Sequence, residues 1–232
     1  MRPVTIVGLA LILVGVGVLG YVGWEYFGTN VVSKHKQSEL RHQLITQWKS
    51  DQGVGEDPGQ EHGTVGTSDG ASQGEQAQIS HAHLGDAFAL LRIPRFGNDY
   101  VMPVVKGVDA DALASGVGWV TDTARPGQVG NFALAAHRVT HGEPFNDFPD
   151  LRVGDKVVVE TRTHIYTYVL DENGTDRAVD FTETWVLDPV PGHPNATPTK
   201  RLITLVTCSE LFHTDNRSVV TGHLASSTRK PA

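Results

Sequence analysis

The sequence predicts an all-β domain, a barrel or a sandwich, that follows an apolar N-terminal segment and a polar linker. Many short runs with strand propensity, separated by turns rich in Gly, Pro, Asn and Asp, occupy residues 84–226. Residues 3–24 carry no charge, and residues 50–80 contain almost no large apolar side chain. A chain of 232 residues can therefore hold one mid-sized domain with flanking segments.

The composition excludes several classes of function. A net charge of -7 and a pI near 5.8 argue against a nucleic-acid partner, because phosphate binding requires a basic face. The chain has a single cysteine, Cys208, so a disulfide within the chain and a zinc site built on several cysteines are both impossible.

Residues 1–28 are predicted to form a transmembrane signal anchor. A helix over the uncharged run 3–24 would be about 33 Å long, and the hydrocarbon core is about 30 Å thick. A buried core helix would rarely be apolar on all sides, and a cleaved signal peptide has a shorter apolar region with small residues before the cut. The positive charges on either side of the run do not favour an external position for the rest of the chain.

Residues 29–83 are predicted to be a helical stalk followed by a flexible linker. Leu40, Leu44 and Trp48 recur every four residues between polar side chains, which is typical of a helix. Residues 50–80 are rich in Gly, Ser, Gln and acidic residues, and such a segment buries too little surface to offset its ordering entropy.

The domain over residues 84–226 is expected to consist mainly of strands, and residues 227–232 form a C-terminal tail. Tyr166, Tyr168 and Val169 give one segment a strong β propensity. The predicted strands are 88–93, 100–105, 131–137, 156–160, 163–172, 201–208 and 217–224, with a short helix over 109–115 and a Pro-rich loop over 188–198.

Cys208 is the candidate nucleophile. It ends the predicted strand 201–208 and precedes a polar loop, and such strand ends can meet a substrate. Most single cysteines are instead small buried residues. A thiol attacks as thiolate, so a catalytic Cys208 needs a base or a cation beside it.

His137 and Arg217 are the candidate partners of Cys208. His137 ends the apolar strand 131–137, as Cys208 ends its own, although a histidine at a strand edge is more often structural. Arg217 opens the strand after Cys208, and its guanidinium could donate to an oxyanion, although most arginines at such a position are surface residues. Lower-ranked histidines lie in loops, at His141, His193 and His213.

Together these residues resemble the sortases, the cell-wall cysteine transpeptidases of Gram-positive bacteria. Residues 204–208 read Thr-Leu-Val-Thr-Cys and fit the TLxTC motif that ends in the family's nucleophile, and Ala136-His137-Arg138 fits the context of its histidine. Arg217 fits the family's arginine in order and spacing. Residues 137–145, 151–160 and 188–198 are most similar to the class E sortases of high-GC species, with classes D and F as alternatives.

The resemblance implies a closed eight-stranded β-barrel with short helices, outside the cell and attached to the membrane by a single span. It implies that Cys208 cleaves the Thr–Gly bond of an LAxTG-like or LPxTG-like sorting signal on a secreted protein. The thioacyl intermediate then passes to an amine of a peptidoglycan precursor. In this scheme His137 is the acid and base, Arg217 stabilises the oxyanion, and no cofactor or metal is expected.

The peptide groove is expected to include Thr121, Ala135, Val206 and Thr207, by their positions along the predicted strands. Small residues on the face of His137 would leave room for a peptide, although they also suit close packing.

Four alternatives compete with this hypothesis. An L,D-transpeptidase would have a Ser-His-Gly-Cys string, and a papain-like protease would have its cysteine before its histidine. Neither pattern occurs here. A non-catalytic, membrane-tethered β-barrel binding module and a pilin-polymerising sortase remain open.

Overall fold

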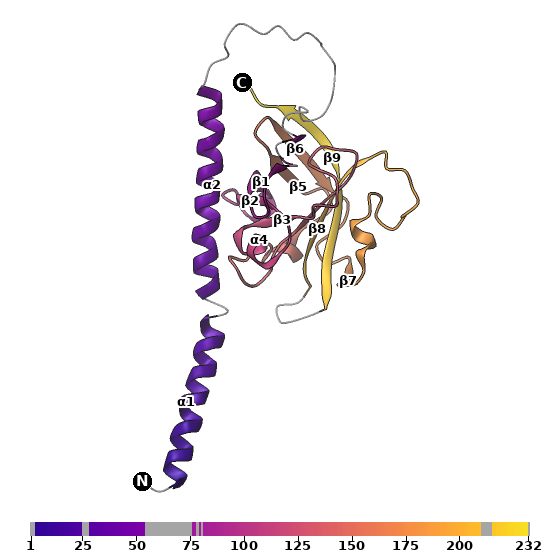
Figure 1. Cartoon of the computed structure of the whole chain (residues 1–232). Coiled ribbons are helices and arrows are strands. Elements are labelled where there is room, and N and C mark those ends of the chain that lie inside the picture. The colour runs from indigo at the N-terminus through magenta and orange to yellow at the C-terminus, as the bar shows by residue number, and fades with distance from the viewer. Residues whose placement is uncertain are drawn as a thin grey trace, which may run out of the picture.

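The computed structural model describes residues 3–24, 28–53, 76–77, 79, 81–209 and 215–231. Two long helices precede a β-sheet domain (Figure 1). The helices are α1 (Pro3–Gly23), α2 (Thr29–Gly53) and α4 (Ala110–Ser115), with short 3-10 helices at Pro94–Phe96, Phe148–Asp150 and Thr184–Leu187. The strands are β1 (Ala87–Arg92), β2 (Met102–Lys106), β3 (Val117–Trp119), β4 (Gly130–Ala135), β5 (Lys156–Glu160), β6 (His164–Leu170), β7 (Ala178–Asp180), β8 (Arg201–Cys208) and β9 (Asn216–Arg229).

The sheet closes on itself. Its strands follow the order β6-β5-β1-β2-β3-β4-β8-β9-β7, and an additional pairing joins β6 to β9. Eight strands therefore form a closed barrel, and β7 pairs with β9 outside the ring. Closure removes the exposed edges that an open sheet would present. The predicted eight-stranded barrel with short helices is confirmed.

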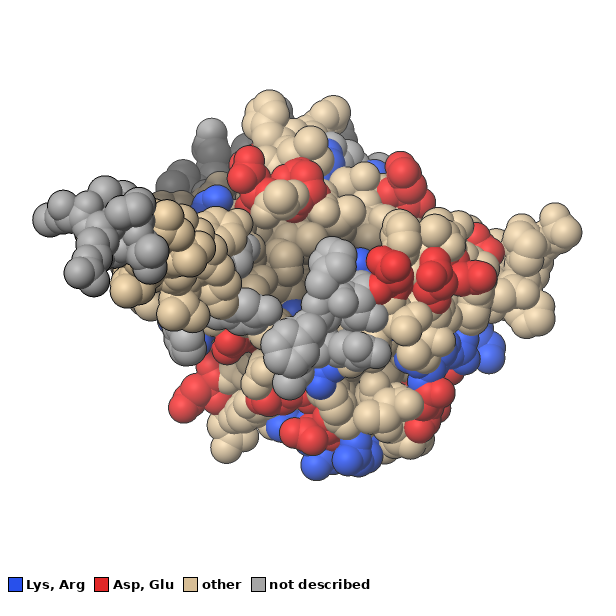
Figure 2. Space-filling model, turned by 90° about the horizontal axis from the view of Figure 1, so that it is seen from below, with Lys and Arg blue, Asp and Glu red and all other residues tan. Residues whose placement is uncertain are grey.

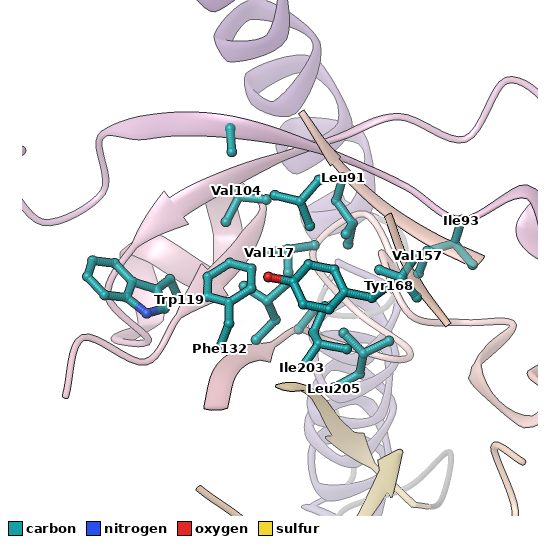
Figure 3. Packing of buried hydrophobic residues seen from close by; sticks show 14 of the residues in the cluster. Leu91, Ile93, Val104, Val117, Trp119, Phe132, Val157, Tyr168, Ile203 and Leu205 are labelled. Atoms are coloured by element: carbon teal, nitrogen blue, oxygen red, sulfur yellow. The ribbon is translucent and has the colours of Figure 1, made fainter. Parts of the chain in front are cut away.

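The barrel interior is filled by alternate residues of each strand. Figure 3 shows Leu91, Val104, Phe132, Tyr168 and Ile203 pointing toward one another from five strands, and all five are buried. The phenol of Tyr168 keeps a partner in this core, because it accepts a hydrogen bond from the Gly127 amide at 2.8 Å. Since neighbouring residues of a strand face opposite sides, the residues between the core positions of β4 and β8 lie on the outer face of the barrel.

The predicted strand positions agree with the observed ones to within a few residues, and the largest differences lie at short or terminal segments. β3 and β7 have three residues each and were not predicted, because so short a run shows no alternation. β9 continues to Arg229 and pairs with β6, so the first half of the predicted tail 227–232 belongs to the barrel.

Helix α1 covers most of the segment that was predicted to span a membrane. Its described side chains are mostly exposed. Within the described part of the chain, which omits residues 1–2 and 25–27, no helix is both long and apolar enough to cross a membrane. The prediction of a transmembrane helix is therefore not supported by the structure.

Helix α2 confirms the predicted helix but lies against the barrel (Figure 1). Leu44 and Trp48 are buried with Leu90 of β1, and the ammonium group of Lys230 lies 4.4 Å from the centre of the Trp48 ring. A free stalk would leave these side chains in water. Most of the predicted linker, residues 54–75, lies outside the described residues.

We expect Trp48→Ala to lower the free energy of unfolding by about 2 to 4 kcal/mol, because it removes a buried ring from the contact between α2 and the barrel. Urea unfolding measures this change, and Thr46→Ala, an exposed site on the same helix, is the matched control. Equal stabilities for the two variants would show that α2 does not contribute to the folded domain in solution.

Candidate active site

The pairing of three neighbouring strands brings the predicted catalytic residues to one level of the barrel. β4 and β8 are parallel, and Ala135 lies opposite Val206. The Ala136 amide continues this ladder by donating to the Val206 carbonyl at 3.1 Å. His137 and Cys208 each lie two residues further on, so they follow the same register. On the other side of β8, Cys208 lies directly opposite Arg217 of β9.

Cys208 lies on the outer face of β8, where it is half-buried. Ile203 and Leu205 of the same strand point into the barrel core. The alternation of the strand therefore places Thr204, Val206 and Cys208 on the opposite side. The thiol therefore lies at the rim of the barrel, at the end of the strand. A purely structural cysteine would instead pack in the interior.

His137 follows β4 and opens a tight loop. Its backbone carbonyl accepts a hydrogen bond from the Phe145 amide at 3.0 Å, and Phe145 is fully buried in the core. The ring of His141 stacks on the ring of His137, with 4.6 Å between their centres and 24° between their planes. From the sequence, His141 was only a lower-ranked candidate in a loop. The signal that indicates this turn is the four-residue spacing from His137 to His141, followed by Gly142.

Burial, and to a lesser extent the electrostatic influence of the adjacent His141 ring, lower the pKa of His137 from 6.5 to about 4. Both effects disfavour the imidazolium form. His137 is therefore a neutral imidazole at pH 7, and a neutral ring nitrogen can accept a proton from a thiol.

Arg217 is the residue of β9 that lies between Cys208 of β8 and Val179 of β7. Its guanidinium carbon lies 6.0 Å from the centre of the Phe181 ring, and one terminal nitrogen donates to the Asn216 carbonyl at 3.0 Å. The planar guanidinium carries several N–H donors, and the pairing of β8 with β9 places Arg217 next to the strand of Cys208. The short strand β7 thus pairs with β9 on the side of Arg217 that is opposite to Cys208.

Two hydrogen bonds tie the chain around His137 to the chain around Cys208. The hydroxyl of Thr207 donates to the Ala136 carbonyl at 2.8 Å, and the guanidinium of Arg138 donates to the Ser209 carbonyl. The residues next to His137 and Cys208 are therefore bonded across β4 and β8. No pattern in the sequence indicates this role of Arg138.

The predicted substrate residues divide into two groups. Ala135 and Val206 are half-buried partners on the outer face of β4 and β8, next to His137 and Cys208, as a groove would require. Thr121 is exposed in the turn after β3. Thr207 points the other way, because it is 2% exposed and its hydroxyl is occupied by Ala136. This orientation turns the Thr207 side chain away from the outer face of the barrel.

The Pro-rich loop is fixed to the same outer face through Asn131. The side-chain amide of Asn131 donates to the Val186 and Asp188 carbonyls, both at 3.1 Å, and accepts from the Thr204 hydroxyl at 2.8 Å. Beyond it, a cavity of about 440 Å³ lies between this loop and the strands β8 and β9, with Leu202 in its lining. Leu202 is six residues from Cys208, or about 20 Å along a strand, so this cavity is separate from the thiol.

The remaining candidate histidines do not add to the site. His193 is exposed in the Pro-rich loop, and His213 lies outside the described residues. Groups of three or more His, Cys, Asp or Glu side chains suited to a metal ion do not occur among the described residues. The face in Figure 2 carries Lys, Arg, Asp and Glu side chains in separate groups rather than a continuous basic surface.

Comparisons with known proteins agree with this geometry. A family model described as a sortase domain matches residues 91–225. The chain is similar to sortase SrtE1 of Streptomyces coelicolor, with 36% identity over 147 residues, which are 60% of this chain but only 41% of that protein. It is also similar to SrtE2 of the same organism, with 27% identity over 96% of this chain and 82% of the relative. The solved structure of sortase E from Streptomyces avermitilis is 40% identical in sequence, and the match spans 65% of this chain and 97% of that chain. The TM-score is 0.57.

The lowered pKa of His137 predicts a loss of stability in acid. Because the unfolded chain takes up a proton near pH 6.5 and the folded chain only near pH 4, the unfolded state binds more protons between these values. The free energy of unfolding should therefore fall by up to about 3 kcal/mol as the pH is lowered from 7 to 4. Urea unfolding at several pH values checks this, with His137→Gln as the comparison. Equal pH slopes for the two proteins would contradict the assigned burial of the imidazole.

Proposed function

Because the chain belongs to the sortase family of cysteine transpeptidases, we propose that it cleaves the Thr–Gly bond of a C-terminal sorting signal and transfers the new end to an amine of a peptidoglycan precursor. The observation that supports this proposal most directly is the common level of His137, Cys208 and Arg217 on three neighbouring strands. The substrate lies on the outer face of β4 and β8, where Ala135 and Val206 leave room for an extended peptide.

The first step forms a thioester. Neutral His137 takes the proton of the Cys208 thiol, and the thiolate attacks the carbonyl carbon of the substrate threonine. The negative charge that develops on the carbonyl oxygen is stabilised by the guanidinium of Arg217. The protonated His137 then gives its proton to the glycine nitrogen, the C–N bond breaks, and the threonine remains bound to Cys208 through a C–S bond.

The second step releases the product. The acceptor amine attacks the thioester carbon and loses a proton to His137 as the new C–N bond forms. The C–S bond breaks and the thiolate of Cys208 leaves, after which it recovers the proton from His137. The pair thus returns to its neutral resting state, which the low pKa of His137 favours.

The preferred signal is an LAxTG-like sequence, and this choice rests on the similarity to sortase E proteins. An LPxTG-like signal is the alternative. We further place the barrel outside the cell, attached to the membrane through residues 1–28, which is supported by the uncharged run 3–24 in the sequence. Membrane fractionation of cells that express the full chain, with protease added from outside, tests this location.

Two alternative functions can be distinguished from this proposal by experiment. A non-catalytic binding module would keep the barrel but not a reactive thiol, whereas the half-buried position of Cys208, in register with His137, favours reaction. A pilin-polymerising sortase would use a lysine side chain as the acceptor, so competition between a lysine peptide and a peptidoglycan-type amine separates the two.

We expect Cys208→Ala to abolish turnover without unfolding the protein, since the small side chain keeps the strand but removes the nucleophile. His137→Ala and Arg217→Ala should each lower kcat by at least about 100-fold, because each removes proton transfer or charge stabilisation. Steady-state peptide cleavage measures both effects, and circular dichroism verifies the fold. A near-normal rate in any variant would take that residue out of its assigned role.

Mass spectrometry tests the proposal as a whole. The protein is incubated with LAxTG and LPxTG peptides and an amine, and we expect a thioacyl adduct on Cys208 together with an amine-exchanged product. The peptide that gives more product identifies the signal. Absence of an adduct with either peptide, in a protein whose thiol reacts with iodoacetamide, would reject both proposed signals, and an unreactive thiol would favour the binding module.

A further inference from the structure

The first half of helix α2 makes three hydrogen bonds to the loop that follows His137. The side chain of Asn30 accepts from the Gly142 amide at 2.8 Å and donates to the Glu143 carboxylate at 2.7 Å. The side chain of Gln37 donates to the His141 carbonyl at 2.9 Å. These bonds join segments that are more than 100 residues apart in the chain. The first half of α2 is therefore polar where it meets the barrel domain.

The loop that α2 contacts has an unfavourable backbone conformation. Three successive residues have positive φ, at 54° for His141, 84° for Gly142 and 56° for Glu143. A non-glycine residue in this region costs about 1 kcal/mol or more, and it persists only where its surroundings hold it. Asn30 and Gln37 supply side-chain bonds to all three residues. Helix α2 is thus a part of what keeps this turn closed.

The contact between α2 and the turn is close. A Cβ atom added to Gly142 would lie 2.6 Å from the side-chain oxygen of Gln37. Gln37 is itself buried, with 4% of its surface exposed, as is Ser33 one turn earlier. The amide of Gln37 therefore lies in a confined space rather than at a flexible surface.

The left-handed turn also places the ring of His141 on the ring of His137. The two rings stack at 4.6 Å between centres, and the backbone between them has only three residues. A change in the conformation of His141 would remove one wall from the His137 ring. We propose that helix α2 is a positioning element of the active site, in which Asn30 and Gln37 hold the left-handed turn 141–143 so that His141 keeps the imidazole of His137 in its reactive place. This inference depends on the proposed role of His137.

The test uses point variants of the full chain and peptide cleavage kinetics. We expect Asn30→Ala and Gln37→Ala each to lower kcat about 10-fold to 100-fold with KM within twofold, because the substrate groove is unchanged while the acid and base is misplaced. Gln43→Ala is the matched control, an exposed glutamine on the same helix. It should keep the parent rate.

A double variant that exchanges the hydrogen-bond donor and acceptor between residues 30 and 143 should restore activity. Asn30→Asp alone sets two carboxylates against each other and should reduce kcat as strongly as Asn30→Ala. Combined with Glu143→Gln, the new amide donates to the new carboxylate, which still accepts from the Gly142 amide, and kcat should return to within about threefold of the parent. Glu143→Gln alone should stay active, because its amide oxygen still accepts from Asn30.

Nuclear magnetic resonance of the histidine rings gives a readout that does not depend on turnover. The His137 signals, assigned by His137→Gln, should shift in Asn30→Ala and Gln37→Ala and stay in place in Gln43→Ala. Unchanged signals, an unchanged kcat, or a rise in KM alone would overturn the positioning role while leaving the transpeptidase proposal intact. Full activity of His137→Ala would instead overturn the proposed function on which the inference depends.

Discussion

The parallel pairing of β4 with β8 is the constraint on which the site depends. It sets the ends of the two strands at one level, and the antiparallel pairing of β8 with β9 extends that level to Arg217. A shift of one residue in either register would turn the side chains of a strand to the opposite face. His137 and Cys208 would then point into a core filled by residues such as Phe132 and Ile203, where no substrate could reach them. The tightly packed interior therefore fixes the chemistry indirectly, because it allows only one register.

The backbone on either side of His137 and Cys208 is tied together by more hydrogen bonds than the strand pairing alone provides. Thr207 and Arg138 each bond across the gap between β4 and β8, one residue before Cys208 and one residue after His137. Such supporting bonds limit the freedom of the reacting groups, which matters because a displacement of about 1 Å can cost two orders of magnitude in rate. In the same way, Asn131 anchors the Pro-rich loop to the outer face of the barrel.

The barrel could be predicted from the sequence because alternation marks the long strands. The candidate set of His137, Cys208 and Arg217 could be proposed because each lies at a strand end or in a short motif. The spacing of His137, His141 and Gly142 indicated a turn, but not the stacking of the two rings, because the left-handed conformation of the turn also depends on side chains more than 100 residues away. The packing of α2 was hidden for a related reason. The apolar residues Leu44 and Trp48 are followed toward the N-terminus, on the same side of the helix, by polar residues. In the sequence these polar residues look like a solvent-exposed surface.

The division of α2 into two halves has a physical reason. Along one stripe of this helix, Ser33 and Gln37 are as deeply buried as Leu44 and Trp48. The apolar pair packs on Leu90 of β1, where burial of area is sufficient to hold the helix. The polar half meets a turn whose backbone groups need partners, and an apolar side chain there would leave buried amides and carbonyls unpaired at a cost of about 1 to 3 kcal/mol each. The second half of the helix therefore supplies the attachment, and the first half uses that attachment to hold the turn beside His137.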